Sequence, residues 1–441
     1  MPYHISILLK KETSRITYAF RTIFLDILGF DRVDFFTDTE SFRKKDGVKI
    51  SYDIYEDTVP FLAAGVNLLY ETSIEHKKPE NFGTDDELPY FYRLSESKSI
   101  LPFDFAAMSF WLLTRYEEYQ PFVPDIHGRF TAAQSFAYQH NFLHLPLIDL
   151  WAIRLRDRLR TFFSDSYLPA PANYSFQPTF DIDYAWAYRN KAIWRNMGAL
   201  ARDVIKMDFK VLTERIAVLR GNKRDPYFSF SDIEAMHKET QKPIFFWLLG
   251  DYGKFDKNTD YENDELKKLI KDFGSKYKIG IHPSYASNEK ENGFVKEKNR
   301  LEAISVQDIT KSRQHFLKLK FPDTYLKLLE IGITDEYSLG YAEVPGFRAS
   351  VSRSFYWYNL ATEQETELRI HPFMIMDVTL NIYLKKNTAE AFEISKRIID
   401  SCRKVGGELI IIWHNNSLCE QKQWLGWTEF YRDLLSYASN K

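Results

Sequence analysis

The sequence predicts an α/β fold built around a mostly parallel sheet, preceded by a smaller mixed α/β domain. From residue 172 onward, apolar or alternating runs typical of strands take turns with segments of helical periodicity. At 441 residues the chain is also too long for one typical core. Proline and alanine alternate at 169–172, which is typical of a linker. We therefore expect two domains, at 1–170 and 172–441.

The first domain is expected to mix short strands with longer helices. Apolar runs at 5–9 and 48–52 each predict a strand. Helical patterns cover 14–28, 102–119 and 147–163, and Ser14 is available to cap the first of them. These elements do not assign the first domain a role.

The second domain is expected to alternate strands and helices along its length. Strand-like runs occur at 174–183, 243–249, 279–283, 309–313, 366–370 and 408–413. Helical patterns lie between them at 231–240, 263–273, 322–331 and 388–405. Residues 187–228 look like a basic helical insertion after the first strand. In such folds, sites form where the parallel strands reach their carboxyl ends.

Composition argues against several classes of protein. The net charge of −2 gives no electrostatic support for nucleic-acid binding. Cys402 and Cys419 are the two cysteines, and two form neither a disulfide framework nor a cysteine metal site. The apolar run at 5–9 is too short for a signal peptide, and no segment is long and apolar enough to span a membrane. We therefore expect a cytoplasmic protein without a membrane span.

Chemically active side chains gather at the ends of four predicted strands. Asp181 and Asp183 end the strand at 174–183, and because strand side chains alternate, both carboxylates face the same way. Two adjacent carboxylates repel each other unless a cation or a shared proton relieves them. The other three strand ends supply His282, Arg313, His315 and His414. Parallel strand ends converge on one edge, so we expect these groups to form one site.

The chemistry of this set points to a metal ion. One aspartate with two histidines suits Zn²⁺ or a similar divalent ion and leaves positions open for water and substrate. A second carboxylate beside such an ion can take a proton from water, and a histidine across the pocket can give one to a leaving group. A single histidine at a strand end is more often a structural residue, but four such strand ends together favour a site.

At these positions the sequence resembles the polysaccharide deacetylases, the NodB-homology group of carbohydrate esterase family 4. Residues 179–183, Thr-Phe-Asp-Ile-Asp, are similar to the first motif of that family, in which one aspartate is the base and the next binds metal. The resemblance therefore implies Asp181 as the base and Asp183 as a metal ligand. The last motif is an apolar strand ending in histidine, which implies a catalytic role for His414. The implied fold for residues 172–441 is a distorted (β/α) barrel.

Two further motifs depart from the family pattern. The His-x-x-x-His motif supplies His282 but has Ala286 in place of the second histidine. In the family, an arginine holds the base. Arg313 matches it by its place in the order of the motifs, and Arg348 matches it by the residues around it, so both remain candidates. Residues 104–119 resemble a helix of a two-domain subgroup whose N-terminal domain is uncharacterised.

The missing histidine leaves two alternatives. His315, two residues after Arg313, could supply the third ligand. Alternatively, the metal site is incomplete and the domain binds glycan without cleaving it. We favour His315, and keep His371 as a lesser candidate for a ligand or a pocket wall.

The resemblance implies a metal-dependent hydrolase, with zinc as the preferred ion, that removes acetyl groups from N-acetylated sugars of a polysaccharide or glycan precursor. A backbone N–H after the turn at His282 is expected to help hold the oxyanion. Two alternatives stay open at this point. The same fold could hydrolyse another C–N bond, or the protein could be a catalytically degenerate glycan-binding protein.

Overall fold

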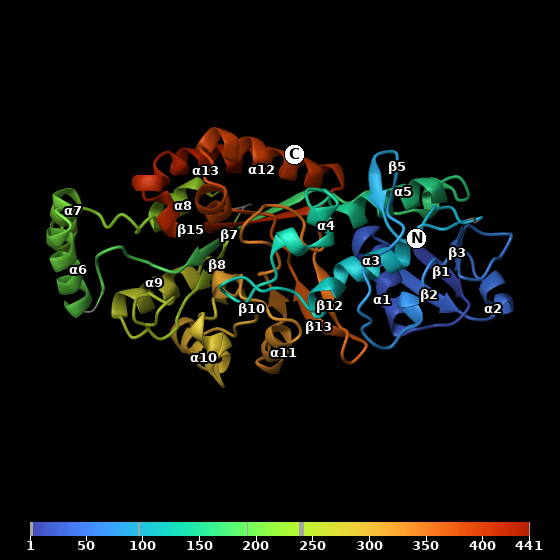
Figure 1. Ribbon diagram of the computed structural model, residues 1–441, viewed down its shortest axis with the longest axis horizontal. Helices are drawn as coiled ribbons and strands as arrows, with labels where there is room; N and C mark the ends of the chain where they lie inside the picture. Colours follow the sequence, from blue (N-terminus) through green and yellow to red (C-terminus); the bar gives the residue numbers. More distant parts are fainter. Residues whose placement is uncertain (1–2, 96–97, 192, 238–241, 441) are drawn as a thin grey trace.

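Two largely parallel sheets organise the chain in the computed structural model (Figure 1). The structure describes residues 3–95, 98–191, 193–237 and 242–440. A four-stranded sheet lies toward one end of the elongated molecule, a nine-stranded sheet runs through its middle, and two helices project from the other end. The expected mixed α/β fold with parallel strands is confirmed.

The four-stranded sheet has the strand order β2-β1-β3-β4, and its strands are parallel. Its members are β1 (His4–Leu9), β2 (Arg32–Phe36), β3 (Val48–Tyr52) and β4 (Phe61–Leu62). The helices in this part of the chain are α1 (Ser14–Arg21), α2 (Thr39–Arg43), α3 (Phe105–Leu113), α4 (Phe136–Gln139) and α5 (Leu147–Leu159). Strands β5 (Gly83–Asp85) and β6 (Leu88–Tyr90) form a separate hairpin.

Two of the expected helix boundaries are corrected. The cap of α1 is Thr13 rather than Ser14, because the Thr13 hydroxyl accepts the N–H of Ile16 at 3.2 Å. The aromatic helix expected at 102–119 is α3. Every residue of α3 is buried, and the helix ends at Leu113. It stops there because Arg115 adopts a left-handed conformation with φ of 55°, after which a 3-10 turn follows at Tyr116–Tyr119.

The nine-stranded sheet has the order β12-β13-β11-β10-β9-β8-β7-β15-β14 within the described residues. Its strands are β7 (Ser175–Ile182), β8 (Ile244–Trp247), β9 (Lys278–Ile281), β10 (Lys311–Ser312), β11 (Asp335–Glu336), β12 (Phe355–Asn359), β13 (Gln364–Ile370), β14 (Ile375–Met376) and β15 (Glu408–His414). All neighbours are parallel except β12 and β13. Each of the six expected strand runs overlaps one of these strands. Closure of this sheet into a barrel remains a prediction.

The register of β7 aligns the strand ends that matter for the site. Asp181 lies opposite Phe246 of β8 and opposite His414 of β15. Apolar side chains bury both faces of these central strands, as expected for parallel strands covered by helices. The carboxyl ends of β7, β8 and β15 therefore lie at the same edge of the sheet.

Helices cover the nine-stranded sheet on both sides. In Figure 1, α12 (Thr388–Lys404) and α13 (Trp427–Ser439) lie above it, and α9 (Asp264–Gly274), α10 (Gly293–Ser305) and α11 (Asp323–Glu330) lie below it. The helix expected at 231–240 is α8 (Phe230–Met236), and positions 238–240 lie outside the described residues. No helix in the described ranges combines the length and apolar character needed to cross a membrane.

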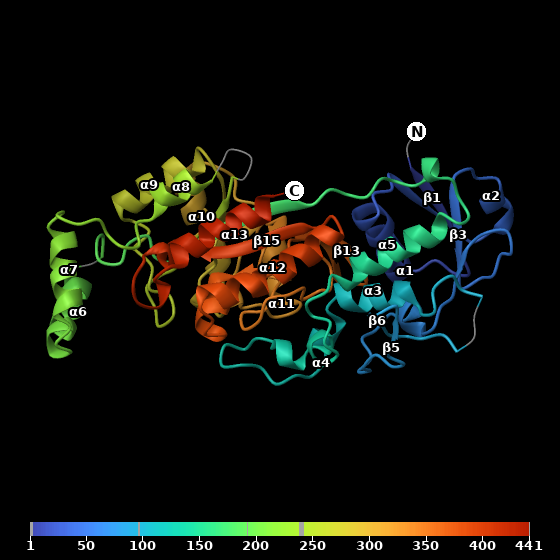
Figure 2. The same ribbon diagram turned by 90° about the horizontal axis from the view of Figure 1, so that it is seen from above.

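The basic insertion expected at 187–228 contains α6 (Ile193–Ile205) and α7 (Phe209–Leu219). Figure 2 shows this hairpin standing clear of the remaining structure at the end opposite the four-stranded sheet. Several of its apolar side chains are exposed, among them Trp194, Ile205 and Phe209.

The first 170 residues pack closely against the nine-stranded part. Arg15, which is fully buried, donates to both oxygens of the Glu363 carboxylate, at 2.8 and 2.6 Å. Asp149 accepts from the backbone N–H of Ser352 at 2.8 Å. One cluster of buried apolar side chains continues from one part to the other. The placement of a domain boundary near residue 170 stays a prediction.

Candidate active site

Four strand ends bring two carboxylates and three imidazoles to one cavity of about 150 Å³. Asp181 is the second-last residue of β7, and Asp183 directly follows that strand. The histidines come from three other strands: His282 follows β9, His315 lies three residues after β10, and His414 ends β15. The convergence expected from parallel strands therefore exists in the fold.

Asp183, His282 and His315 form a group with the geometry of a metal site. Each offers one ligand atom, and these atoms all lie within 4.8 Å of one another. The Nε2 of His282 is 3.3 Å from one carboxylate oxygen of Asp183, and the Nε2 of His315 is 3.6 Å from the other. Ligands placed about 2.0–2.2 Å from a shared zinc ion are separated by distances of this order.

The hydrogen positions and charges of Asp183 and His282 also suit the binding of a cation. The Nδ1 of His282 lies 2.6 Å from the carbonyl oxygen of Arg313, which can only accept, so Nδ1 bears a hydrogen. In the neutral ring, Nε2 therefore presents a lone pair to Asp183, whose buried Oδ1 has no hydrogen-bond partner among the described residues. Burial alone would raise the pKa of Asp183, but His315 and His282 hold it well below its usual range. Asp183 is therefore an ionised carboxylate beside two imidazoles, a set of side chains that suits a divalent ion.

Asp256 orients His315 from behind. Its Oδ1 accepts from the Nδ1 of His315 at 2.9 Å, and the side chain of Asp256 is only 2% exposed. Burial alone would lower the pKa of His315, but the carboxylates of Asp183 and Asp256 raise it to about 9. Without a metal ion the ring thus holds a proton, and a metal ion would displace it. A carboxylate behind a ligating imidazole is a common outer-shell arrangement in metal sites.

Ala286, which stands where the motif has its second histidine, supplies no ligand but helps to hold Asp256 in place. The backbone N–H of Ala286 donates to Asp256 at 3.1 Å, and that of Tyr285 donates to it at 2.8 Å. The turn that would bear the second histidine of the family motif therefore holds the carboxylate that positions His315. Sequence reasoning missed Asp256 because it lies in an irregular loop, where no strand register indicates its direction.

The expected oxyanion donor after His282 is not available. Pro283 has no N–H, and the N–H of Ser284 already donates to Glu297 at 2.7 Å. The next N–H groups, those of Tyr285 and Ala286, bind Asp256. The expectation was wrong because this turn uses its donors to hold two buried carboxylates.

Of the two candidate arginines, Arg313 is the one beside Asp181. Its Nη1 lies 2.8 Å from the Oδ1 of Asp181 and 2.6 Å from the hydroxyl of Thr179. The guanidinium also lies over the ring of Phe246, 4.5 Å from its centroid. Arg348 instead pairs with Glu118 at 2.5 Å and donates to the carbonyl of Gly340, away from the cavity.

His414 has its own buried carboxylate partner. Its Nδ1 lies 2.8 Å from the Oδ1 of Asp377, and its Nε2 lies 3.9 Å from Asp183. Burial alone would lower the pKa of His414, but Asp377 outweighs burial and raises the value to about 10. Asp377 follows β14, a two-residue strand whose shortness left no pattern in the sequence. The other candidate, His371, bonds to Ser354 and Asp335 and does not line the cavity.

One wall of the cavity comes from the N-terminal part of the chain. Arg129 lines the cavity, pairs with Asp125 at 2.7 Å and donates to the carbonyl of Phe316 at 2.8 Å. It also reaches the hydroxyl of Tyr383, another lining residue, at 3.3 Å. No sequence signal identified Arg129, because nothing along the chain indicates that residues near 129 meet the strand ends.

Comparisons with known proteins give one family match and distant structural neighbours. Residues 5–164 match a family of unknown function, DUF7033. No curated protein matches the chain. A solved structure from Mycobacterium smegmatis, assigned to the polysaccharide deacetylases, is 13% identical with a TM-score of 0.37 over 60% of this chain and 86% of that one. The polysaccharide deacetylase Bc1974 from Bacillus cereus is 12% identical with a TM-score of 0.30 over 60% and 88%. At these scores neither neighbour is evidence for the fold or the function of this chain.

Proposed function

We propose that this protein is a metal-dependent hydrolase that removes the acetyl group from an N-acetylated sugar of a polysaccharide or glycan precursor. The observation that supports it most is the pairing of two independent units in one cavity. One is the Asp183–His282–His315 group, and the other is the buried ion pair of Asp181 with Arg313, at 2.8 Å. The motif resemblance of residues 179–183 and 410–414 to the polysaccharide deacetylases adds the substrate class.

Asp183, His282 and His315 would hold the metal, with zinc as the ion this donor set prefers. A divalent ion bound there would act as a Lewis acid toward the amide carbonyl and would lower the pKa of water. The protein's own contribution is to keep the ligand atoms in place. The carbonyl of Arg313 and the carboxylate of Asp256 do so by binding the far nitrogens of the two imidazoles.

Asp181 is placed to act as the general base. Its Oδ2 lies 3.9 Å from the Nε2 of His282, so it borders the same space without belonging to the ligand group. The guanidinium of Arg313 binds its other oxygen and restricts rotation of the carboxylate. Asp181 accordingly takes the proton of the attacking water.

His414 is placed to act as the general acid. Asp377 binds its Nδ1 and favours the protonated ring, so Nε2 holds a proton and faces the cavity. This proton passes to the nitrogen of the departing amine as the C–N bond breaks. The acid and the base thus come from the neighbouring strands β15 and β7.

Two alternatives have weaker support. A degenerate glycan-binding protein would not need Asp183 ionised against two imidazoles whose outer nitrogens are both occupied. Hydrolysis of a different C–N bond remains compatible with the same base and acid. We further propose that residues 172–441 form a distorted (β/α) barrel and that residues 1–170 form a domain that lends Arg129 to its pocket.

Elemental analysis of the purified protein, combined with acetate release from N-acetylglucosamine oligomers, tests the proposal. We expect about one divalent ion per chain and acetate release that a chelator abolishes. Metal without acetate release, but with hydrolytic opening of a cyclic imide to its amide–carboxylate product, would assign the other C–N hydrolase. If the protein neither bound metal nor hydrolysed either substrate when metals were supplied, the proposal that it is an enzyme would be overturned.

A further inference from the structure

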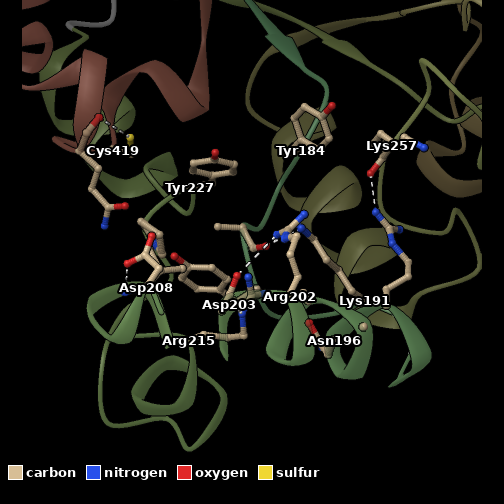
Figure 3. Close-up of a pocket in the computed structure, with 18 of the residues that line it drawn as sticks. Tyr184, Lys191, Asn196, Arg202, Asp203, Asp208, Arg215, Tyr227, Lys257 and Cys419 are labelled. Atoms are coloured by element: carbon tan, nitrogen blue, oxygen red, sulfur yellow. Dashed lines mark hydrogen bonds and ion pairs between the residues drawn. The ribbon is translucent and has the colours of Figure 1, made fainter. Parts of the chain in front are cut away.

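A second and larger cavity lies beside the candidate active site. Its volume is about 830 Å³, and it is enclosed by the α6–α7 hairpin, the loop around Lys257 and the segment after β15. Figure 3 shows Tyr184 and Tyr227 along one side of this space and basic side chains of the hairpin along the other. Nothing in the proposed reaction uses this cavity.

The lining of this cavity is strongly basic. Five cationic side chains come from the hairpin region: Lys191, Arg195, Arg202, Lys206 and Arg215. Lys257 and Lys422 add two more from neighbouring loops, whereas the only lining carboxylates within the described residues are Asp203 and Asp208. The excess of positive charge is notable because the whole chain has a net charge of −2.

The few local carboxylates do not neutralise this charge. Asp203 is shared by two of the cations, Arg215 at 2.8 Å and Arg202 at 3.7 Å, and Asp208 caps α7 by accepting the N–H of Val211. In the part of the chain that the structure describes, no carboxylate lies within 4.0 Å of Lys191, Arg195 or Lys206. Burial, followed by repulsion from Arg195, lowers the pKa of Lys191 to about 8. Lys191, Arg195 and Lys206 therefore lack a carboxylate partner among the described residues.

Two of the basic groups, Arg195 and Lys191, are held in place by contacts with the protein. The guanidinium of Arg195 lies 4.3 Å from the ring centroid of Tyr252 and donates to the carbonyls of Lys257 and Asn258, at 2.8 and 3.1 Å. The amine of Lys191 donates to the carbonyl of Ala187. Ordering long cationic side chains before a ligand arrives lowers the entropic cost of binding an anion.

Aromatic rings and one unpaired amide complete the lining. Tyr184 and Tyr227 present ring surfaces of the kind that pack against the faces of sugars. The Oδ1 of Asn196 is buried and has no hydrogen-bond partner among the described residues, so it can accept a hydrogen bond from a hydroxyl group of a ligand. The combination suits a ligand that has both sugar rings and negative charge.

Two chain segments connect the cavity to the candidate active site. Tyr184 lines the basic cavity, and its neighbour Asp183 lines the catalytic one. Lys257 likewise lines the basic cavity, and its neighbour Asp256 binds the ligand His315. Along one segment the basic cavity is thus one residue away from a member of the metal group, and along the other it is one residue away from the carboxylate that orients His315.

We propose that the basic cavity binds the acidic part of the glycan substrate, through sugars that bear carboxylate or phosphate groups. The proposal rests on the function proposed above, which makes a glycan the substrate. Arg202 and Lys206, exposed on the open side of the cavity, contact the anionic groups, and the tyrosines contact the sugar rings.

A titration of the chelator-treated protein with three probes tests this proposal. The fluorescence of the exposed Trp194 reports binding. Tetragalacturonate supplies carboxylates, UDP-N-acetylglucosamine supplies phosphates on a sugar, and maltotetraose is the neutral control. We expect one or both anionic probes to bind, with an affinity that falls as salt is added, and maltotetraose not to bind. Binding of tetragalacturonate alone identifies a carboxylate site, binding of UDP-N-acetylglucosamine alone identifies a phosphate site, and binding of both identifies a site that accepts either anion.

The double variant Arg202→Glu/Lys206→Glu should weaken binding of the anionic probe by about tenfold or more, since it turns attraction into repulsion at two contacts. Lys210→Glu/Arg220→Glu is the matched control, because both residues are exposed on the same hairpin but outside the cavity lining. We expect this control to bind as the wild type does. Equal melting temperatures would show that both variants are folded.

The proposal is overturned if neither anionic probe binds, if maltotetraose binds equally well, or if the two double variants behave alike. Anionic phospholipid vesicles are titrated separately. Binding to the vesicles alone would also overturn the proposal and would assign the exposed hairpin to a membrane surface. The titration requires neither metal nor hydrolysis. Failure of acetate release with intact anion binding would therefore count against the proposed reaction and not against this site.

Discussion

The Nη1 of Arg313 lies 2.8 Å from the Oδ1 of Asp181, and neither residue is more than 3% exposed. Replacing Asp181 by asparagine removes the base while preserving the shape of the side chain. We expect Asp181→Asn to lower kcat about 10²–10⁴-fold, the range attributed to a positioned general base. The metal content should stay at the wild-type value, because Asp181 is outside the ligand group. Full activity in this variant would exclude Asp181 as the base.

The second prediction concerns His315, the proposed third metal ligand. His315→Ala should lose most of its zinc affinity because a direct ligand is gone. Asp256→Asn should lose about 10–100-fold, since only the carboxylate behind His315 changes. Competition with a chromogenic chelator measures both. Asp251→Asn, an exposed change in the same loop, is the control, and affinities equal to that control would assign the third ligand elsewhere.

The third prediction separates proton donation from metal binding. His414→Gln should reduce kcat about 10²–10⁴-fold with the metal retained, because the proton for the amine is lost. Asp377→Asn should also reduce kcat, since it removes the charge that holds His414 protonated. His371→Gln, outside the cavity, serves as the comparison. If His414→Gln and Asp377→Asn both lost their metal instead, His414 would be a ligand and not the acid.

The fourth prediction is a pH dependence of stability that comes from Glu297. This residue is 4% exposed, accepts from the N–H and hydroxyl of Ser284, and has its pKa raised by burial from 4.5 to about 7. Between these two values the folded state binds more protons than the unfolded state, so stability falls as pH rises from about 4.5 to 7. The shift corresponds to about 3 kcal/mol at most.

Glu297→Gln keeps a donor and an acceptor for Ser284 but cannot ionise. Denaturant unfolding at pH 5 and pH 8 should therefore show a smaller loss of stability for this variant than for the wild type. Glu291→Gln, an exposed change in the preceding loop, should behave as the wild type does. An unchanged pH dependence in Glu297→Gln would mean that other groups cause the effect.

The sequence was most informative where strand geometry constrains direction. Asp181, Asp183, His282 and His414 were identified because alternation and parallel strand ends place them on one edge. Arg313 and Arg348 could not be separated along the chain, because their partners, Asp181 and Glu118, are more than a hundred residues away from them. Only the fold shows which carboxylate each guanidinium meets.

Residues outside regular elements were beyond the reach of such patterns. Asp256 lies in a loop and Asp377 follows a two-residue strand, so neither had a periodic signal. Arg129 reaches the cavity only because the N-terminal part packs against the strand ends. The basic insertion was visible as composition, but the cavity it forms with Tyr184 and Lys257 depends on how α6 and α7 fold back.

A zinc titration of chelator-treated protein, followed by acetate release from N-acetylglucosamine oligomers, tests the central claim most directly. We expect no release without metal, a rise as zinc is added, and a break at about one equivalent per chain. Asp183→Asn should show no such rise, because it removes the only carboxylate of the ligand group. Release that is independent of zinc, or none at any zinc concentration, would contradict a metal-dependent deacetylase.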